Sequence, residues 1–451
     1  MVEYTDVANT GIAWLPQIPQ HWEVRKLKYA FNERSEKGYP DEPLLVSSQN
    51  MGVVPKSVYG KRTVEALKDL DKLKLVKAGD YVVSLRSFQG GIEYAYYQGI
   101  ISPAYTIMEP HKDFKSDYYK FLFKSAPFIK LLTTCVTGIR EGQNVDYKKL
   151  RNVEIPVPPR AEQDQIVRFL DWKVSEINKL IRIRRKEIQE LEEYRAVKLT
   201  SITHYGLDKN RTLKDTGYSW IGAIPADWHV RAFSKVASVK SNIVQPESYM
   251  EEMQVSPASI EKNTGKIIQT QTVKESGIIS GNHRFYQGQI LYSKVRPLLN
   301  KVAIASFDGL CSADMYPIET ALDTKYFLYF MLSQNFLGQL SMSGNRVKMP
   351  KINQDELSSV LILFPDIKEQ KLIAKKLDQL FALVDGQIER IKQNTSLLQE
   401  LKSVVISDVV TGKIDVRNVT VPEYEHVDDF VDDDCENHEE TEETETDGEE
   451  A

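Results

Sequence analysis

Loops rich in arginine, lysine, hydroxyl and amide side chains are the parts of this sequence best suited to chemistry with a ligand. Ser84-Leu-Arg-Ser-Phe-Gln-Gly-Gly91 follows an apolar run and combines a guanidinium with hydroxyls and an amide. Thr137-Gly-Ile-Arg-Glu-Gly-Gln-Asn144 has a similar mixture. Arg and Lys suit phosphates and guanine edges, Gln and Asn suit adenine edges, and Gly lets the backbone approach a ligand closely. These residue types favour recognition of a nucleic acid.

Both loops return in the second half of the chain. Ser293-Lys-Val-Arg-Pro-Leu-Leu-Asn-Lys301 corresponds to the first loop, and Ser343-Gly-Asn-Arg-Val-Lys348 corresponds to the second. One such loop is weak evidence, because surface loops are often rich in these residues, but recurrence in matching places strengthens all four. The predicted DNA-contacting residues are Ser84, Arg86, Ser87, Gln89, Thr137, Arg140, Gln143, Asn144, Ser293, Lys294, Arg296, Asn300, Lys301, Arg346 and Lys348.

Motifs of catalysis are missing from the sequence. Thr411-Gly-Lys413 lacks the first glycine and the hydroxyl residue of a phosphate-binding loop, and the seven histidines are scattered without metal-ligand spacing. The Asn/Asp-Pro-Pro-Tyr/Phe motif of amino-methyltransferases is also absent. We therefore expect no catalytic residue and no metal site in this chain. Two alternatives remain: a stand-alone DNA-modifying enzyme with an atypical site, and a coiled-coil scaffold that binds only proteins.

The loops repeat because most of the chain repeats. Gly11–Trp22 returns as Gly217–Trp228 with an offset of 206, and Ile155–Gln163 returns as Ile362–Gln370 with an offset of 207. This period is too long for a solenoid and indicates a duplicated domain. Two similar halves present two similar surfaces, which suits a ligand with two separated sites.

Each half has the same order of predicted elements, which indicates one α+β fold used twice. The predicted strands and short helices of the first half cover residues 80–84, 100–107, 117–124 and 127–132, and those of the second half cover residues 289–293, 314–318, 324–332 and 360–364. The four tryptophans of the repeated motif are expected to pack into cores rather than to stack on bases: Trp14, Trp22, Trp220 and Trp228.

A long helix follows each closing motif, because apolar residues recur at steps of three and four over about 40 residues after Pro159 and after Pro365. Each helix would be ~60 Å long. We expect the two helices to pack together as an antiparallel coiled coil with pseudo-two-fold symmetry; the alternative is that each packs only on its own domain. The seam residues predicted at the helix interface are Ile177, Ile181, Ile188, Val384, Ile388 and Leu398.

Charge is distributed unevenly along the 451 residues. The net charge is −6, but residues 421–451 hold 16 acids and no Lys or Arg, so residues 1–420 carry a net +10. A moderately basic body fits a polyanion partner, although many proteins that bind no nucleic acid have such a charge. The basic run Asn178–Lys186 favours a solvated helix face over a DNA contact. The acidic tail favours solubility, with competition against DNA for the basic surface as a lesser alternative.

The sequence also indicates a cytoplasmic location. Its start has no signal-peptide pattern, and no run approaches the ~18 apolar residues of a membrane span. The three cysteines are far apart, which argues for a reducing compartment. The expected organisation is a first α+β domain (1–160), a central helix (161–205), a second α+β domain (206–365), a distal helix (366–415) and an acidic disordered tail (416–451).

Together these motifs resemble the specificity subunits of type I restriction-modification systems. The resemblance lies in two domains that open with Trp-x-Gly-x-Ile-Pro-x-x-Trp, as in Trp220–Trp228 and the divergent Trp14–Trp22. It continues in the closing motif Ile155–Gln163 before a long helix and in the ending Val410–Val416. The second closing motif departs from the pattern, with Phe364-Pro-Asp in place of Pro-Pro. The resemblance covers residues 11 to about 417.

The resemblance implies a non-catalytic subunit in which each domain recognises one half of a split, double-stranded DNA target and the paired helices set the gap. It implies two modification subunits that methylate adenine with S-adenosylmethionine, and restriction subunits that use ATP and Mg for translocation and cleavage; this chain itself would bind no cofactor. Glu162, Gln163, Glu369 and Gln370 are expected at helix starts near partner contacts, with helix capping as the alternative.

Overall fold

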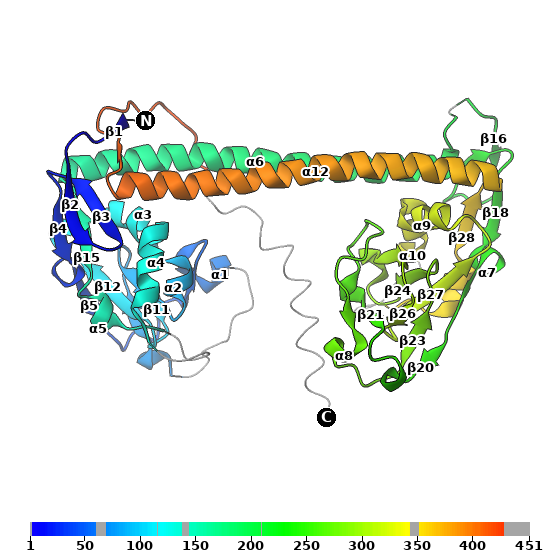
Figure 1. The fold of residues 1–451 in the computed structure, drawn as a ribbon, viewed down its shortest axis with the longest axis horizontal. Helices are drawn as coiled ribbons and strands as arrows, with labels where there is room; N and C mark the ends of the chain where they lie inside the picture. The colour runs from blue at the N-terminus through cyan, green and yellow to red at the C-terminus, as the bar shows by residue number, and fades with distance from the viewer. Residues whose placement is uncertain are drawn as a thin grey trace. The chain divides into compact units, whose positions relative to one another are not determined.

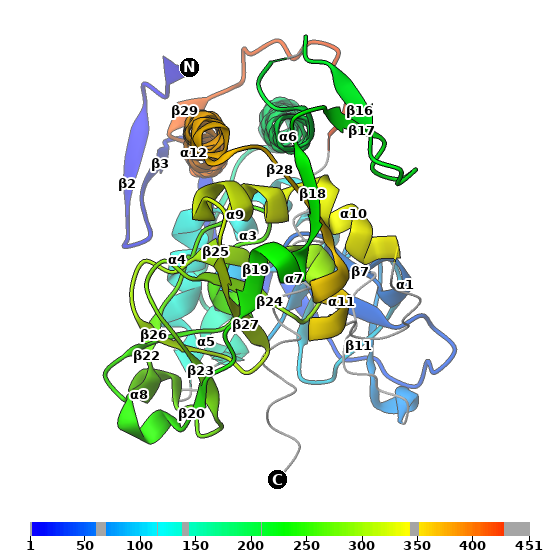
Figure 2. The same ribbon diagram turned by 90° about the vertical axis from the view of Figure 1, so that its right-hand side faces the viewer.

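Two long helices are the largest elements of the structure, a computed structural model. α6 (Arg160–Tyr205) and α12 (Ile367–Val410) lie side by side (Figures 1 and 2). Arg195 of α6 donates to Asp385 of α12 at 2.7 Å, and Lys402 of α12 donates to Asn178 of α6 at 3.3 Å. From the first pair to the second, the residue number falls on α6 from 195 to 178 and rises by the same amount on α12 from 385 to 402. The helices are therefore antiparallel, as the sequence predicts.

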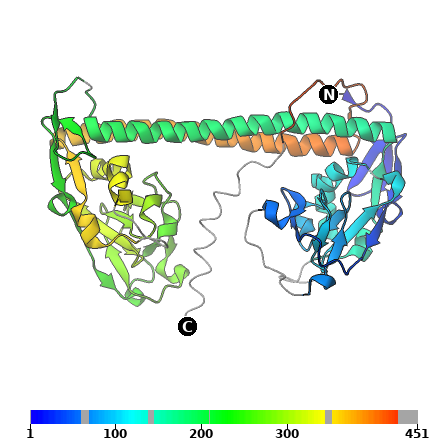
Figure 3. The ribbon, with the colours of Figure 1, turned by 180° about the vertical axis from the view of Figure 1, so that it is seen from behind.

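The structure describes residues 2–59, 69–114, 116–137, 144–208, 210–342 and 351–427. They form two compact units: unit 1 contains the residues up to 185 and those from 392, and unit 2 contains residues 186–391. Each unit therefore contains one recognition domain and one half of each long helix (Figures 1 and 3). None of the described helices has the length and apolar character needed to span a membrane.

Glycine ends both long helices at equivalent positions. Gly206 and Gly412 have φ angles of 77° and 74°, where other residues are strained. A Cβ at Gly412 would lie 2.2 Å from Pro19 Cδ and 3.1 Å from Trp22 Cη2. A Cβ at Gly206 would lie 3.2 Å from Trp228 Cζ2. The end of α12 thus packs against the opening segment of the first domain, and the end of α6 packs against that of the second domain. For this reason each unit combines segments from both ends of its part of the chain.

Unit 1 is an α+β domain around a core of aromatic side chains. Its four-stranded sheet has the order β10 (Glu93–Tyr94), β9 (Tyr81–Val83), β12 (Thr106–Pro110) and β5 (Phe31–Arg34). The opening strand β4 (Glu23–Lys26) pairs with the closing strand β15 (Glu154–Val157). Smaller pairs join β1 (Val2–Glu3) to β29 (Ile414–Asp415), β2 (Val7–Ile12) to β3 (Leu15–Pro19), β6 (Leu45–Ser48) to β7 (Gly52–Pro55), β8 (Lys74–Val76) to β11 (Gly99–Ile101), and β13 (Val136–Thr137) to β14 (Asn144–Val145). Its helices besides α6 and α12 are α1 (Lys56–Tyr59), α2 (Ser87–Gly90), α3 (Tyr118–Lys124), α4 (Ala126–Thr134) and α5 (Tyr147–Leu150).

Unit 2 repeats this plan and joins more of its strands into a second sheet. Its opening strand β18 (His229–Ala232) pairs with its closing strand β28 (Leu361–Phe364), as in unit 1. The sheet equivalent to that of unit 1 has the order β19 (Ala237–Val239), β27 (Met315–Thr320), β24 (Ile290–Ser293) and β25 (Val302–Ile304). The second sheet has the order β20 (Ile243–Val244), β23 (Asn282–Phe285), β26 (Gly309–Cys311), β21 (Met253–Val255) and β22 (Gln271–Thr272), and β16 (Leu213–Asp215) pairs with β17 (Ala223–Pro225). Its pairs β23–β26, β21–β26 and β21–β22 correspond to β8–β11, the parallel bridge Leu44–Ile100 and β6–β7 of unit 1. The short helices of unit 2 are α7 (Phe233–Val236), α8 (Val273–Ser276), α9 (Thr324–Leu332), α10 (Gln334–Met342) and α11 (Gln354–Ser359).

The tryptophans of the repeated motif have different surroundings in the two units. Trp22 and Trp228 are buried, and Trp14 packs edge-on against Phe128 with ring centroids 5.6 Å apart. Trp220, the counterpart of Trp14, is 43% exposed. The expectation of core packing is therefore wrong for Trp220, because unit 2 provides no equivalent contact for this arm of the described chain.

The packed chain also continues past residue 416, where the tail was expected to begin. Val416 and Val427 are buried, and the Gln165 side chain of α6 donates to the carbonyls of Val416 at 3.0 Å and Val419 at 2.7 Å. We call residues 411–427 the C-terminal strap. Its valines pack against an apolar surface of unit 1. Residues 416–427 therefore belong to the packed chain and not to the acidic tail, which was expected to begin at residue 416.

Candidate nucleic-acid interface

The first candidate loop of unit 1 is a short, internally bonded turn at the end of β9. The Ser84 N–H donates to Ser87 Oγ at 2.8 Å, which folds the chain directly into α2. Ser87 is buried, whereas Arg86 and Gln89 are exposed. The turn is thus fixed by its own hydrogen bond, while the Arg86 guanidinium and the Gln89 amide face solvent.

Two contacts fix the far end of this loop. Gly91 has a φ of 89°, and a Cβ there would lie 2.4 Å from the Phe123 carbonyl oxygen, so only glycine allows the observed approach. The Lys124 ammonium donates to the Gly90 carbonyl at 3.0 Å and pairs with the buried carboxylate of Glu93. Burial raises the pKa of Glu93 to about 7. The loop is therefore attached to α3 by both backbone packing and a charge.

The ends of the second candidate loop of unit 1 lie beside the first loop. α2 contacts β14, which pairs with β13 at the two ends of this loop. Thr137 and Asn144 are both exposed, and their side chains are 3.4 Å apart from hydroxyl to amide oxygen. Arg140 and Gln143 lie outside the described residues. The fold therefore brings the first loop beside the ends of the second, which lies about 50 residues further along the sequence.

In unit 2 the first candidate loop contacts the described residues that follow the second. The Lys294 carbonyl accepts from the Ile352 N–H at 2.9 Å, and Val295 forms a bridge with Lys351, directly after the second loop. The ammonium of Lys351 lies 3.1 Å from Asp314 Oδ1, and that of Lys294 lies 3.7 Å from the same oxygen. Lys351 was missed from the sequence, although its place three residues after Lys348 could have indicated it. Arg346 and Lys348 themselves lie outside the described residues.

Arg296 has an unusual backbone conformation. Its φ is 48° and its ψ is 58°, the left-handed region that a non-glycine residue seldom adopts, and Pro297 follows it. Arg296 and Lys301 are partly exposed. Backbone strain of this kind persists only where the surrounding structure supports it, and it is found often at functional sites.

Three of the predicted DNA contacts are corrected by the structure. Ser87, Ser293 and Asn300 are almost wholly buried. Asn300 donates from Nδ2 to the Met331 carbonyl at 3.2 Å, and the Ser293 hydroxyl donates to the Val295 carbonyl at 3.0 Å. Their hydrogen bonds shape the loops, so these polar side chains support the interface from inside. Ser84 is partly exposed.

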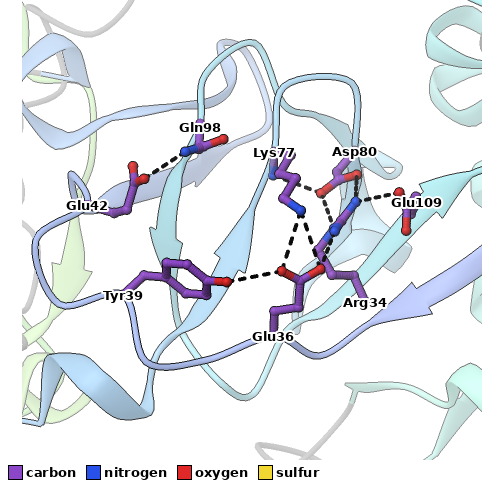
Figure 4. Close-up of polar contacts among 8 residues, drawn as sticks. All are labelled: Arg34, Glu36, Tyr39, Glu42, Lys77, Asp80, Gln98 and Glu109. Atoms are coloured by element: carbon purple, nitrogen blue, oxygen red, sulfur yellow. Dashed lines mark hydrogen bonds and ion pairs between the residues drawn. The ribbon is translucent and has the colours of Figure 1, made fainter.

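A buried charge cluster supports the first loop's strand from the other end, and the sequence did not reveal it. Arg34 donates from Nε to Asp80 Oδ2 at 2.9 Å, and its remaining nitrogens pair with Glu36 at 2.5 Å and Glu109 at 2.7 Å (Figure 4). Asp80 also accepts the Lys77 N–H at 2.8 Å, which closes the turn before β9. Gln289 has the same place in unit 2, where its amide accepts from Tyr286 N–H at 3.0 Å.

The helix-start residues bind within their own units. Glu162 is buried and accepts hydrogen bonds from Tyr4, from the Trp22 indole at 3.0 Å and from His21, whose Nε2 lies 2.7 Å away. Glu369 pairs with Arg211 at 2.8 Å. These carboxylates join each opening segment to a helix start, and their expected role near partner contacts stays a prediction.

The glutamines of the closing motifs also bond inside the units. Gln163 donates to the Pro158 carbonyl and Gln370 to the Pro365 carbonyl, each at 2.8 Å, and both are buried. Side-chain capping of the helix instead comes from Asp366, which accepts the Lys368 and Glu369 N–H groups at 2.9 Å. Among the seam residues, Ile177, Ile181, Val384 and Ile388 are buried, and Ile188 and Leu398 are partly exposed.

A family model with the description "Type I restriction modification DNA specificity domain" matches the chain twice, over residues 19–193 and 235–393. Each match covers one recognition domain and half or more of its following helix. Within the described residues, no three His, Cys, Asp or Glu side chains are grouped as metal ligands would be. The molecule is thus of the class of DNA-specificity proteins with two copies of one recognition domain.

Relatives narrow this class. The chain is 31% identical over 298 residues to the type I restriction enzyme EcoDI specificity subunit of Escherichia coli, covering 62% of this chain and 67% of that one. It is 24% identical over 426 residues to the MjaVIII specificity subunit of Methanocaldococcus jannaschii, covering 89% and 95%. A chain solved in work on assembly and conformational transition of the type I R-M system has a TM-score of 0.63 at 15% identity, covering 88% of this chain and 99% of that one, and shows the same fold.

This chain belongs to the family of type I restriction-modification specificity subunits. It recognises a DNA target and works in a complex with DNA and other subunits of the system. Its role is recognition and not catalysis, as in its relatives.

Proposed function

We propose that each unit reads one half of a bipartite DNA target with its own pair of loops. The observation that carries this proposal is the repeated geometry: in each unit a basic loop at the end of a sheet strand contacts residues that directly flank a second polar loop. In unit 1 the exposed side chains include Arg86 and Gln89, and in unit 2 Lys294, Arg296 and Lys301 are partly exposed. The guanidinium and amide groups suit base edges, and the ammonium groups suit phosphates.

The paired helices then set the gap between the two half-sites, because a rigid helix pair fixes distance better than a flexible linker. Two modification subunits methylate adenine with S-adenosylmethionine, and restriction subunits use ATP and Mg. Base flipping needs a pocket and a cofactor in those partners. The family membership and the positions of the loops support this arrangement.

A map of methylated adenines in cells that express single variants tests the proposal. Arg86→Ala should relax or abolish recognition of one half of the methylated motif and leave the other half unchanged, and Arg296→Ala should have the converse effect. A lost base contact costs ~1–3 kcal/mol of discrimination. Arg25→Ala and Arg231→Ala are matched controls, because these arginines lie at equivalent places on β4 and β18, paired with the closing strands and away from the loops.

The map also distinguishes the rival functions. A scaffold that binds only proteins would give the same methylated motif in all four variants. A change in both halves of the motif from Arg86→Ala alone would overturn the assignment of one half-site to each unit.

A further inference from the structure

The C-terminal strap follows α6 in a definite direction. Near its start, Gln165 of α6 donates to the carbonyls of Val416 and Val419. At its end, Asn178 Nδ2 donates to the Val427 carbonyl at 3.0 Å, and the Val427 N–H donates to Ser175 Oγ at 3.3 Å. Residue numbers thus rise together on the strap and the helix. The described chain ends while it runs along α6 toward the helix's C-terminal end.

The next turn of α6 on this face is basic. Residues three and four apart share a face of a helix, so Arg182 follows Asn178 on the side that the strap covers. Arg182 is exposed, and Lys179 already lies 3.9 Å from Glu425 of the strap. We call Lys179 and Arg182 the basic face of α6. It belongs to the run Asn178–Lys186 that the sequence singled out and that DNA reading by the loops does not use.

The sequence that follows the strap is complementary to this face. Residues 428–434 are Asp-Asp-Phe-Val-Asp-Asp-Asp, five acids without a basic residue. Their first carboxylate is one residue beyond Val427, and seven residues can extend ~23 Å, whereas one helical turn is ~5.4 Å. Tethering at Val427 keeps these acids at an effective concentration of about millimolar beside the helix.

We propose that residues 428–434 dock on the basic face of α6, as a continuation of the strap. Carboxylates beside Lys179 and Arg182 neutralise this part of the helix and close it to DNA phosphates. The docked acids direct non-specific DNA binding away from α6 and toward the reading loops. The contact is electrostatic and partly exposed, so salt weakens it.

The full chain offers a specific reporter, because Cys135 and Cys311 are buried and a maleimide dye can be attached to Cys435. The fluorescence anisotropy of this dye should be high at low salt and fall as NaCl approaches ~1 M, where the screening length is ~3 Å. The double variant Lys179→Glu/Arg182→Glu should have the low value already at low salt. Changing Asp428 and Asp429 to Lys in that variant should restore the high value.

Lys375→Glu/Lys376→Glu is the matched control, since both lysines are exposed on α12 and carry the same charge change. It should leave the anisotropy as in the parent. Hydrogen exchange of residues 416–427 checks that the strap itself stays bound in every variant. The proposal fails if the Lys179/Arg182 variant keeps the parent anisotropy, or if Arg86→Glu or Arg296→Glu releases the dye instead, which would place the acids on the reading loops.

Discussion

Asn178 and Asp385 occupy equivalent positions on the two long helices, and each accepts a hydrogen bond from a basic side chain of the other helix. Lys402 donates to Asn178 at 3.3 Å, and Arg195 donates to Asp385 at 2.7 Å. The Arg195 side chain is only 8% exposed and lies 5.0 Å from the centre of the Phe381 ring. The two long helices are thus joined in unit 1 by a hydrogen bond to a neutral amide and in unit 2 by an ion pair.

This difference predicts unequal effects of the same substitution. Asp385→Ala leaves the buried Arg195 guanidinium without its carboxylate and should lower the free energy of unfolding by ~3 kcal/mol. Asn178→Ala removes neutral hydrogen bonds and should cost ~1–2 kcal/mol. Urea denaturation of the two variants measures both. Equal costs would show that the ion pair contributes no more than the amide.

Trp22 and Trp228 provide a second matched pair. The Trp22 indole N–H donates to the Glu162 carboxylate, whereas that of Trp228 is buried and has no acceptor among the described residues. Phe in place of either Trp removes the N–H and some volume. Trp22→Phe should therefore cost ~2 kcal/mol more than Trp228→Phe, the value of a hydrogen bond to a charged group. Thermal unfolding with hydrogen exchange for each unit measures the difference, and a larger cost at Trp228 would contradict it.

Much of this architecture follows from the sequence, because the repeat and the apolar period of the helices are local patterns. The roles of single polar residues are not local. Glu162 is bonded to Tyr4, 158 residues away, and the burial of Asn300 depends on the Met331 carbonyl. Such roles depend on which segments the fold brings together, and a residue type shared by two repeats does not reveal them. Trp220 shows the same limit, since its motif matches that of Trp14 while its surroundings do not.

The second sheet of unit 2 was missed for a related reason. β20 and β22 have two residues each, and β21 pairs in parallel with β26 across a long separation in sequence. Strands this short carry no readable alternation. The candidate loops were found because they recur, whereas the charge cluster around Arg34 recurs only in part. In unit 2 the amide of Gln289 takes the place of Asp80, and Lys240 pairs with Glu319.

Gly91→Ala should damage the first reading loop. The new Cβ would lie 2.4 Å from the Phe123 carbonyl oxygen, so α2 must shift, in addition to the ~1–2 kcal/mol cost of a positive φ. We expect loss of recognition of one half of the target in the methylation map. Gly79→Ala is the control, because Gly79 has a φ of 97° but a Cβ there meets no described heavy atom within 4 Å. Equal loss in both variants would mean that backbone strain alone is responsible.

Glu93 should make the stability of unit 1 depend on pH. Burial raises its pKa from 4.5 to about 7, although Lys124 opposes the shift. The folded chain therefore binds more protons than the unfolded chain between these values, and stability falls as the pH rises through this window. Glu93→Gln removes the titration and should gain ~1–3 kcal/mol relative to the parent between pH 5 and pH 8. Urea unfolding at both pH values tests this; a difference that stays constant, or that shrinks with pH, contradicts it.

Arg296 allows strain and recognition to be separated. Its left-handed backbone costs ~1–2 kcal/mol for any residue with a Cβ, and glycine avoids that cost. Arg296→Gly should therefore be more stable than Arg296→Ala by ~1 kcal/mol, while both variants lose recognition of the second half of the target to the same degree. Denaturation measures the first effect and the methylation map the second. If the alanine variant is the more stable one, the backbone at this position is not strained, and if either variant keeps the parent motif, the guanidinium does not contact DNA.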